Sequence, residues 1–181
     1  MIQPVEGPRT QTTERITDIT TVLGETLAIP QSRTVVAIVI ECRGKIALFR
    51  RSRQLGHDRG LWHCITGFVE VGIPPGQQAV RELFEETGLQ AKDLIEFREG
   101  PALVIKDLLE KPWLVHTFIV RSNRRRLTID WEHDAYRWAL PGKTRRFSNR
   151  VSWLDTVLGE TGYIPTSPYS GSRVLGQHLA G

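Results

Sequence analysis

The segment from Gly67 to Leu89, GFVEVGIPPGQQAVRELFEETGL, constrains the fold more than any other part of the chain. Pro74, Pro75 and Gly76 suit the entry to a helix, and Pro75 suits the first helical position, where a missing N–H costs nothing. Gly88 suits the left-handed residue that ends many helices. The sequence therefore predicts one well-bounded helix within this segment.

Three carboxylates of the predicted helix, Glu82, Glu85 and Glu86, lie at positions i, i+3 and i+4. At about 100° per residue they form one stripe beside an arc that we expect to be core. That apolar arc comprises Ala79, Val80, Leu83 and Phe84. Like charges at this spacing cost a helix roughly 0.2–0.5 kcal/mol per pair. A hard divalent cation with oxygen ligands would compensate them, whereas the plainer alternative is a solvated acidic face.

The same segment resembles the Nudix box, Gly-x5-Glu-x7-Arg-Glu-U-x-Glu-Glu-x-Gly-U with U apolar, which is the signature of the Nudix hydrolase family. One defined position departs, because Ile73 stands where the family has its first Glu. In the family that Glu typically pairs with the Arg of the box, so Arg81 must find another carboxylate, and Glu70 in the same loop is a candidate. The matching positions are Gly67, Arg81, Glu82, Leu83, Glu85, Glu86, Gly88 and Leu89.

This resemblance implies an α/β protein, specifically a Nudix-type α/β/α sandwich with a mixed β-sheet over residues 31–160. It also implies Mg²⁺-dependent hydrolysis, with Mn²⁺ as a substitute, of a phosphoanhydride bond in a nucleoside diphosphate linked to another group. Such a metal neutralises phosphates and lowers the pKa of a bound water. Glu82, Glu85 and Glu86 would hold the metal, with the Thr66 carbonyl nearby by analogy.

Two acidic residues are candidates for accepting the proton of the attacking water, Glu82 and Glu132. Glu132 lies in the segment Trp131–Trp138, which resembles a region where many family members carry an additional acidic residue before a Trp. Arg81 is assigned to the catalytic group as the Arg of the box.

Substrate contacts are expected from two arginines and one aromatic residue. The segment Lys45–Arg51 resembles the strand that precedes the box and often ends in a basic residue. We therefore expect Arg51 first, and Arg53 second, to contact substrate phosphate. Phe68 is a candidate for stacking on a base or ring.

Local patterns predict the other elements. Two strands, 34–41 and 46–50, form a hairpin whose turn contains Gly44. A strand over 61–70 leads into the box. Two more strands pair over 101–106 and 113–121, and a helix over 151–158 has Ser148 or Asn149 as its cap.

Length and hydropathy bear on domain organisation and localisation. The 181 residues fit one domain with short extensions. We expect an N-terminal arm or short packing helix over 1–30, where Ile16, Ile19 and Val22 or Leu23 have near-helical spacing, and a C-terminal tail over 161–181. The longest apolar run, Val35–Ile40, is too short to span a bilayer. The N-terminus lacks the features of a secretory signal, so we expect a cytoplasmic protein without membrane partners.

Basic residues exceed acidic ones by a small margin, 24 against 20, and cluster in short runs. Runs such as Arg124–Arg126 and Lys143–Arg150 can attract polyphosphate or nucleic acid. Solvated loop charge is the simpler interpretation, so the expected partner is a small nucleoside diphosphate derivative and not a nucleic acid. A homodimer is one option for assembly.

Two other functions stay open. Isopentenyl-diphosphate isomerases share the fold that the resemblance implies and use a catalytic Cys beside the box Gly, where this chain has Thr66, with Cys64 two residues earlier. An isoprenoid-diphosphate isomerase is therefore an alternative, although a packed core Cys64 is favoured. Ile73 favours the other alternative, a Nudix-fold nucleotide- or RNA-binding module without turnover.

Overall fold

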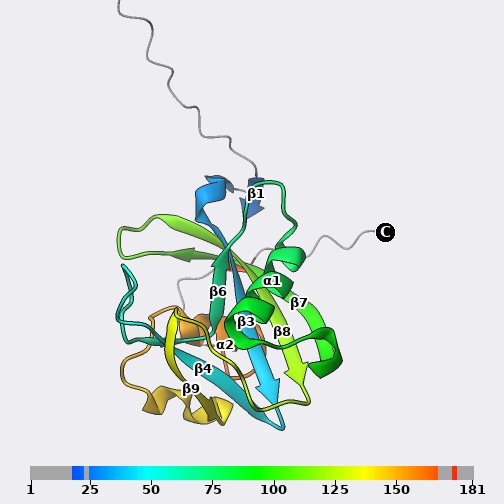
Figure 1. Cartoon of the computed structure of the whole chain (residues 1–181). Helices are drawn as coiled ribbons and strands as arrows, with labels where there is room; N and C mark the ends of the chain where they lie inside the picture. Colours follow the sequence, from blue (N-terminus) through cyan, green and yellow to red (C-terminus); the bar gives the residue numbers. More distant parts are fainter. Residues whose placement is uncertain (1–17, 23–24, 167–172, 175–181) are drawn as a thin grey trace, which may run out of the picture.

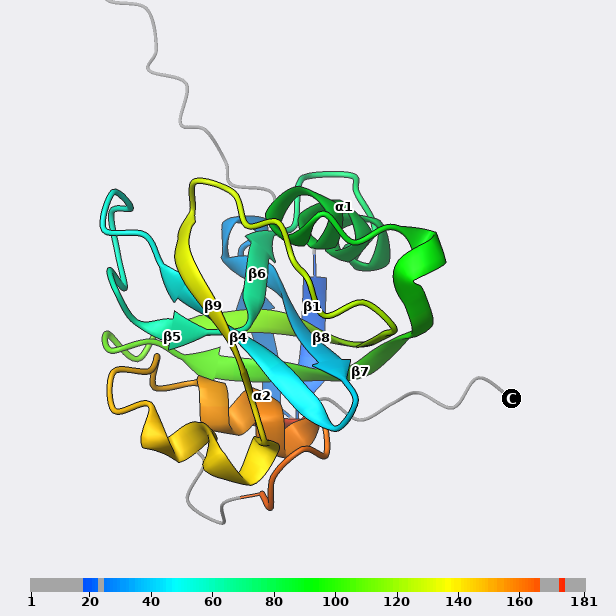
Figure 2. The same cartoon turned by 60° about the horizontal axis from the view of Figure 1, so that its bottom comes forward.

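A computed structural model describes residues 18–22, 25–166 and 173–174. Figure 1 shows a mixed sheet with helix α1 on one face, and Figure 2 shows helices η3 and α2 together on the opposite face. This arrangement is the α/β/α sandwich that the resemblance implied. The helices are η1 (Gln31–Arg33), α1 (Pro75–Thr87), η2 (Ala91–Asp93), η3 (Pro141–Arg146) and α2 (Leu154–Glu160).

The main sheet runs in the order β10-β7-β8-β3-β4-β5, while β6 pairs with β3 and β9 pairs with β4. Strands β3 and β8 pair in parallel, and the other strand pairs described for this sheet are antiparallel. An isolated bridge between Trp62 and Arg150 is also parallel. The strands are β3 (Thr34–Cys42), β4 (Lys45–Arg51), β5 (Trp62–His63), β6 (Ile65–Phe68), β7 (Leu94–Lys106), β8 (Pro112–Ser122), β9 (His133–Ala139) and β10 (Arg173–Val174).

The predicted hairpin is confirmed as β3 and β4, which pair at Glu41–Ile46 and Cys42–Lys45. Its turn residues Arg43 and Gly44 both have positive φ, 53° and 73°, as two-residue hairpin turns require. Beyond these two pairs the strands diverge, because β3 pairs with β6 while β4 pairs with β5 and β9. The sheet is therefore split beside the box.

The predicted strand over 61–70 is two short strands instead of one. Trp62 and His63 pair with β4, whereas Ile65 to Phe68 pair with β3. Cys64 lies at the junction and is buried. The chain changes partners at this residue because it crosses the split in the sheet, which local periodicity does not encode.

Two further predictions about the termini of the domain need correction. Residues 18–22 and 25–29 form an antiparallel pair, β1 (Asp18–Val22) and β2 (Glu25–Ile29), so Ile19 and Val22 lie in a strand and not in a helix. Ile16 and Leu23 lie outside the described residues. The last helix begins at Leu154, later than expected, and no side chain caps it.

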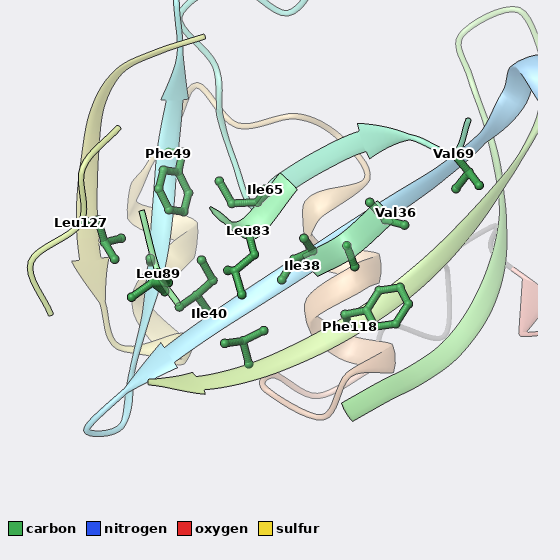
Figure 3. Close-up of a cluster of buried hydrophobic side chains, with 13 residues drawn as sticks. Val36, Ile38, Ile40, Phe49, Ile65, Val69, Leu83, Leu89, Phe118 and Leu127 are labelled. Carbon is green, nitrogen blue, oxygen red and sulfur yellow. The ribbon is translucent and has the colours of Figure 1, made fainter. Parts of the chain in front are cut away.

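The core on the α1 side of the sheet contains buried side chains from α1 and from strands β3, β4, β6 and β8 (Figure 3). Strand β3 has buried residues on both faces, which explains its unbroken apolar run. Alternate residues therefore serve two cores: Val36, Ile38 and Ile40 pack toward Leu83 of α1, and Ala37 and Val39 pack toward α2. None of the described helices is both long and apolar enough to cross a membrane.

Candidate active site

Helix α1 begins at Pro75 and ends before Gly88, whose φ is 67°, as the sequence predicted. Its inward face is rotated relative to the prediction. Val80 and Phe84 are exposed by 52% and 53%, whereas Glu86 is exposed by only 3%. The helix therefore turns Glu82 and Glu86 toward the sheet and leaves Glu85 exposed, and the predicted core arc is correct only for Ala79 and Leu83.

Glu82 lies directly against the backbone of Gly67 in β6. A Cβ atom added at Gly67 would overlap the Glu82 carboxylate, so this close approach requires glycine. The buried Gln78, one turn earlier on α1, donates a hydrogen bond from Nε2 to Glu82 Oε1 at 2.8 Å. Burial raises the pKa of Glu82, while this hydrogen bond acts in the opposite direction. Gln78 was not singled out from the sequence, although its i−4 spacing from Glu82 was a usable signal.

Glu86 is the most perturbed carboxylate of the site. Burial raises its pKa to about 10, and the nearby charges of Glu82, Glu132 and Asp130 act in the same direction. Its Oε2 atom has no hydrogen-bond partner and lies 3.6 Å from Nε2 of His133. An orphaned buried carboxylate oxygen of this kind is costly unless a proton or a cation satisfies it.

Two buried histidines pack behind Glu86. His63 Nε2 and His133 Nε2 lie 3.1 Å apart, and Asp130 Oδ1 lies 3.3 Å from Nδ1 of His133. Burial lowers the pKa of both histidines. The sequence assigned neither histidine to the site, because their 70-residue separation hides the contact.

Glu132 and Arg51 meet at the same end of the sheet. The Ser52 N–H donates to the Glu132 carbonyl at 2.7 Å, which ties the loop before β9 to the end of β4. Burial and the charge of Asp130 raise the pKa of Glu132, whereas Arg51 lowers it. The charge of Glu82 also raises the pKa of Glu132, so the structure brings both predicted proton acceptors to one site.

Arg51 is buried, with an exposed fraction of 8%. Its Nε atom has no hydrogen-bond partner, and it forms no ion pair with any acidic residue that the structure describes. A buried guanidinium without a direct anionic partner is unfavourable. The geometry therefore favours an exogenous anion at Arg51.

Arg81 has found the replacement partner that its sequence context required. Its Nη1 atom donates to Glu70 Oε1 at 2.6 Å, so Glu70 takes the role left by Ile73. Both side chains are substantially exposed, by 40% and 60%. The pair fixes the box loop against α1 and contributes little free energy.

Four predicted site residues remain: Phe68, Arg53, Glu85 and Thr66. Phe68 follows Gly67 in β6, and neighbouring residues of a strand face opposite sides, so the Phe68 side chain points away from Glu82. Its ring centre lies 6.0 Å from the ring centre of Trp113. The structure thus does not support Phe68 as a stacking residue beside the carboxylates. Arg53 and Glu85 are exposed, and their predicted contacts with phosphate and metal stay predictions, as does that of Thr66.

Cys64 is a core residue. Its side chain is 1% exposed, and burial raises the pKa of its thiol to about 12. A thiol that holds its proton so strongly is a poor nucleophile or acid–base group at neutral pH. This observation disfavours the isomerase alternative.

The residues present fit a divalent cation, even though no three described acidic, His or Cys side chains already surround a common point. The donors are hard carboxylate oxygens, which Mg²⁺ prefers. Glu82 and Glu86 interact directly: Glu82 raises the pKa of Glu86 through its charge and a side-chain hydrogen bond, whereas that hydrogen bond lowers the pKa of Glu82. A cation bound between them would relieve both this repulsion and the orphaned Glu86 oxygen.

Glu86 makes the stability of the metal-free protein depend on pH. Because its pKa is raised from about 4.5 to about 10 on folding, folding takes up a proton, and stability must fall as pH rises between these values. We expect Glu86→Gln to raise the free energy of unfolding at pH 8 in EDTA, and to change it little near pH 4. Urea denaturation at both pH values tests this, with the exposed Glu85→Gln as control. Equal effects at both pH values would contradict it.

The departure at Ile73 can be tested separately. We expect Ile73→Glu to leave metal dependence unchanged and to alter the rate only modestly, because Arg81 already pairs with Glu70. A second exposed pair should add no more than about 1 kcal/mol to stability. Denaturation and steady-state kinetics of Ile73→Glu and of Glu70→Gln measure both quantities. Activity that appears only in Ile73→Glu would instead identify the natural chain as a silent module.

Comparison with known proteins identifies the same region. The family model described as NUDIX domain matches residues 30–152. An octanoyltransferase of Myxococcus xanthus is 35% identical over 117 residues, which are 60% of this chain and 31% of that protein. The NAD-capped RNA hydrolase NudC of Edwardsiella ictaluri is 40% identical over 65 residues, 36% of this chain and 24% of that protein. The chain thus spans less than a third of the length of these relatives.

A solved structure with a similar fold is the NUDIX domain of Shewanella oneidensis NrtR complexed with ADP ribose. The TM-score is 0.57 at 15% identity, over 68% of this chain and 82% of that one. At this identity the similarity concerns the fold alone.

Proposed function

The chain belongs to the Nudix hydrolase family, and we propose that it hydrolyses a phosphoanhydride bond in a nucleoside diphosphate linked to another group. The observation that carries this proposal is that carboxyl groups suited to a cation and a buried arginine suited to an anion lie at one site. The pKa of three carboxyl groups, Glu82, Glu86 and Glu132, is raised, so that a proton or a cation stabilises each of them, and the buried Arg51 beside them would be stabilised by an anion. A metal-bound pyrophosphate bridge supplies both.

Each residue then has a chemical task. Mg²⁺ held by Glu82 and Glu86 would neutralise the phosphates and make a bound water more acidic. Arg51 would bind a phosphate oxygen and stabilise the charge that develops on it. Glu82 already accepts a hydrogen bond from Gln78, so we assign the water's proton to Glu132. The water oxygen bonds to phosphorus, and the bond from that phosphorus to the bridging oxygen breaks.

The ligands named for similar proteins share one chemical form. NudC proteins act on NAD-capped RNA by name, and the solved NrtR domain holds ADP ribose. Both ligands contain a nucleoside diphosphate joined to a second group. We therefore propose a substrate of this general form in a cytoplasmic setting, with the second group as the variable part.

A substrate panel with product analysis by mass tests the proposal. We expect cleavage of at least one nucleoside diphosphate derivative with Mg²⁺ or Mn²⁺, and loss of that activity in excess EDTA with recovery on adding metal. The panel should span ADP-ribose-like compounds, dinucleoside polyphosphates, nucleoside triphosphates and capped RNA. Full activity in EDTA would refute the metal assignment, and no cleavage of any compound would favour the binding module.

A further inference from the structure

A second charged surface lies at the far end of β9 from the carboxylates. We call it the β9 basic surface. The chain enters η3 directly from β9 (Figure 2), so cations of η3 lie there beside one from β4 and one from the loop before β9. Its members are Lys45, Arg125, Lys143 and Arg146.

The four cations lack acidic partners. Within residues 25–166, none of them forms an ion pair with a described carboxylate. Their neighbours differ: Arg124 pairs with Asp93 at 3.4 Å, and Arg145 and Arg150 both pair with Asp155. These neighbouring arginines therefore have acidic partners, whereas the cations of the β9 basic surface have none among the described residues, and a surface of this kind attracts polyanions.

The surface is also hollowed and aromatic. A groove of about 410 Å³ is lined by Lys45, Lys143 and Arg146 together with Trp138, Leu140 and Phe147. The guanidinium of Arg125 lies 5.6 Å from the Trp138 ring centre, and the Trp138 Nε1–H donates to the Arg125 carbonyl at 3.0 Å. Cationic walls around apolar rings suit a ligand that has both phosphates and planar bases, as single-stranded nucleic acid does.

The groove and the carboxylate site lie at opposite ends of β9. The loop before β9 runs back along that strand: Arg125 contacts Trp138, the Leu127 N–H donates to the Tyr136 hydroxyl at 3.4 Å, and Asp130 contacts His133. Five residues of strand separate Trp138 from His133, which is about 17 Å. A small nucleotide cannot reach from one end to the other, but a polymer strand can.

We propose that the β9 basic surface binds a single RNA strand whose 5′ end lies in the carboxylate site. This inference rests on the proposed function for the choice of RNA. A polynucleotide that carries a phosphoanhydride bond at its end is RNA, because RNA chains start from an unprimed nucleotide that keeps its phosphates. The inference revises the expectation that nucleic acid is not a partner, which treated the basic runs as separate loops.

Binding can be tested without catalysis. The probe is a 5′-hydroxyl RNA of about 16 nucleotides, measured by fluorescence anisotropy in EDTA over a range of salt concentrations. Each lost phosphate contact should reduce the slope of log K against log salt by about 0.7. Lys143→Gln/Arg146→Gln should therefore reduce it by about 1.4 and weaken binding about tenfold or more at 0.1 M salt.

The matched control is Arg33→Gln/Lys111→Gln, which removes the same charge from η1 and from the β7–β8 connection, away from β9. Equal weakening in the control would overturn the proposal, as would the absence of measurable RNA binding by the natural chain. Equal affinity for DNA of the same sequence, or equal competition by poly-glutamate, would overturn the assignment to RNA.

Kinetics separate this inference from the proposed function. The substrates are a capped dinucleotide and a capped RNA of about 16 nucleotides. Lys143→Gln/Arg146→Gln should lower kcat/KM about tenfold for the long substrate and leave the dinucleotide unchanged. Failure of the natural chain to cleave either substrate, with RNA binding intact, would refute the hydrolase and leave the surface standing. Equal loss on both substrates would overturn the surface.

Discussion

Replacing Gly67 by Ala is expected to reduce kcat by about two orders of magnitude while leaving the protein folded. The added methyl group would overlap the Glu82 carboxylate, which is the far end of a flexible side chain. Glu82 can therefore swing aside at little cost to the fold. The swing removes a metal-binding carboxylate from the reacting centre, where a metal ion would supply several kcal/mol of transition-state stabilisation, so a loss of about two orders of magnitude is expected. Steady-state kinetics and thermal denaturation together measure the two effects.

The controls follow from the same contact. Gly56→Ala adds a methyl group to a loop glycine that has open space around it, and it should change nothing. Glu82→Gln should lower kcat to a similar extent as Gly67→Ala. The double variant should be no worse than either single one, because both act on the same carboxylate. Additive losses would show that Gly67 serves the site by some route other than Glu82.

The sequence predicted helix α1 and the β3–β4 hairpin well because their signals are local. Pro75 and Gly88 mark the helix ends by backbone geometry alone, and a two-residue turn with Gly44 sets the hairpin. The fold class came from the resemblance, which the structure and the family match bear out. The signals for the helix ends and the hairpin turn depend on local backbone geometry and not on long-range contacts.

The direction in which α1 faces could not be predicted in the same way. Periodicity places Val80 and Phe84 beside Leu83, yet both are exposed, and the buried arc includes Gln78 and Glu86. Hydrophobicity ranks residues by their average cost of burial. It cannot register that Glu86 is buried 3.6 Å from His133, in surroundings that raise the pKa of its carboxyl group to about 10.

Long-range pairing accounts for the other omissions. Strand β9 and its partner β4 are 82 residues apart at the pair Arg51–His133, and this pairing brings His63, His133 and Asp130 together behind Glu86. No spacing rule in a single sequence connects such positions. Glu132 and Arg51 were found only because each resembled a family feature, whereas the buried histidines had no counterpart in that resemblance.

Replacing Arg51 by Met is expected to lower kcat/KM by about 10²–10³, the usual effect of losing one donor to a developing negative charge. The same change should leave stability unchanged or slightly higher. Arg51 is buried, its Nε atom is unpaired, and replacing a poorly compensated buried charge by an apolar group of similar size is often neutral or stabilising. Kinetics on the best substrate and urea denaturation provide the two measurements.

A lower kcat/KM together with an unchanged or higher stability distinguishes a phosphate-binding arginine from a structural one. The matched control is Arg50→Met on the same strand, where the guanidinium lies 6.0 Å from the Trp62 ring centre on the other face of the sheet. That variant should lose some packing energy and keep its kcat/KM. If Arg51→Met unfolds more easily and retains its kcat/KM, Arg51 stabilises the carboxylate cluster and the anion site lies elsewhere. If it loses activity at unchanged stability, the buried cation is held in place for a ligand.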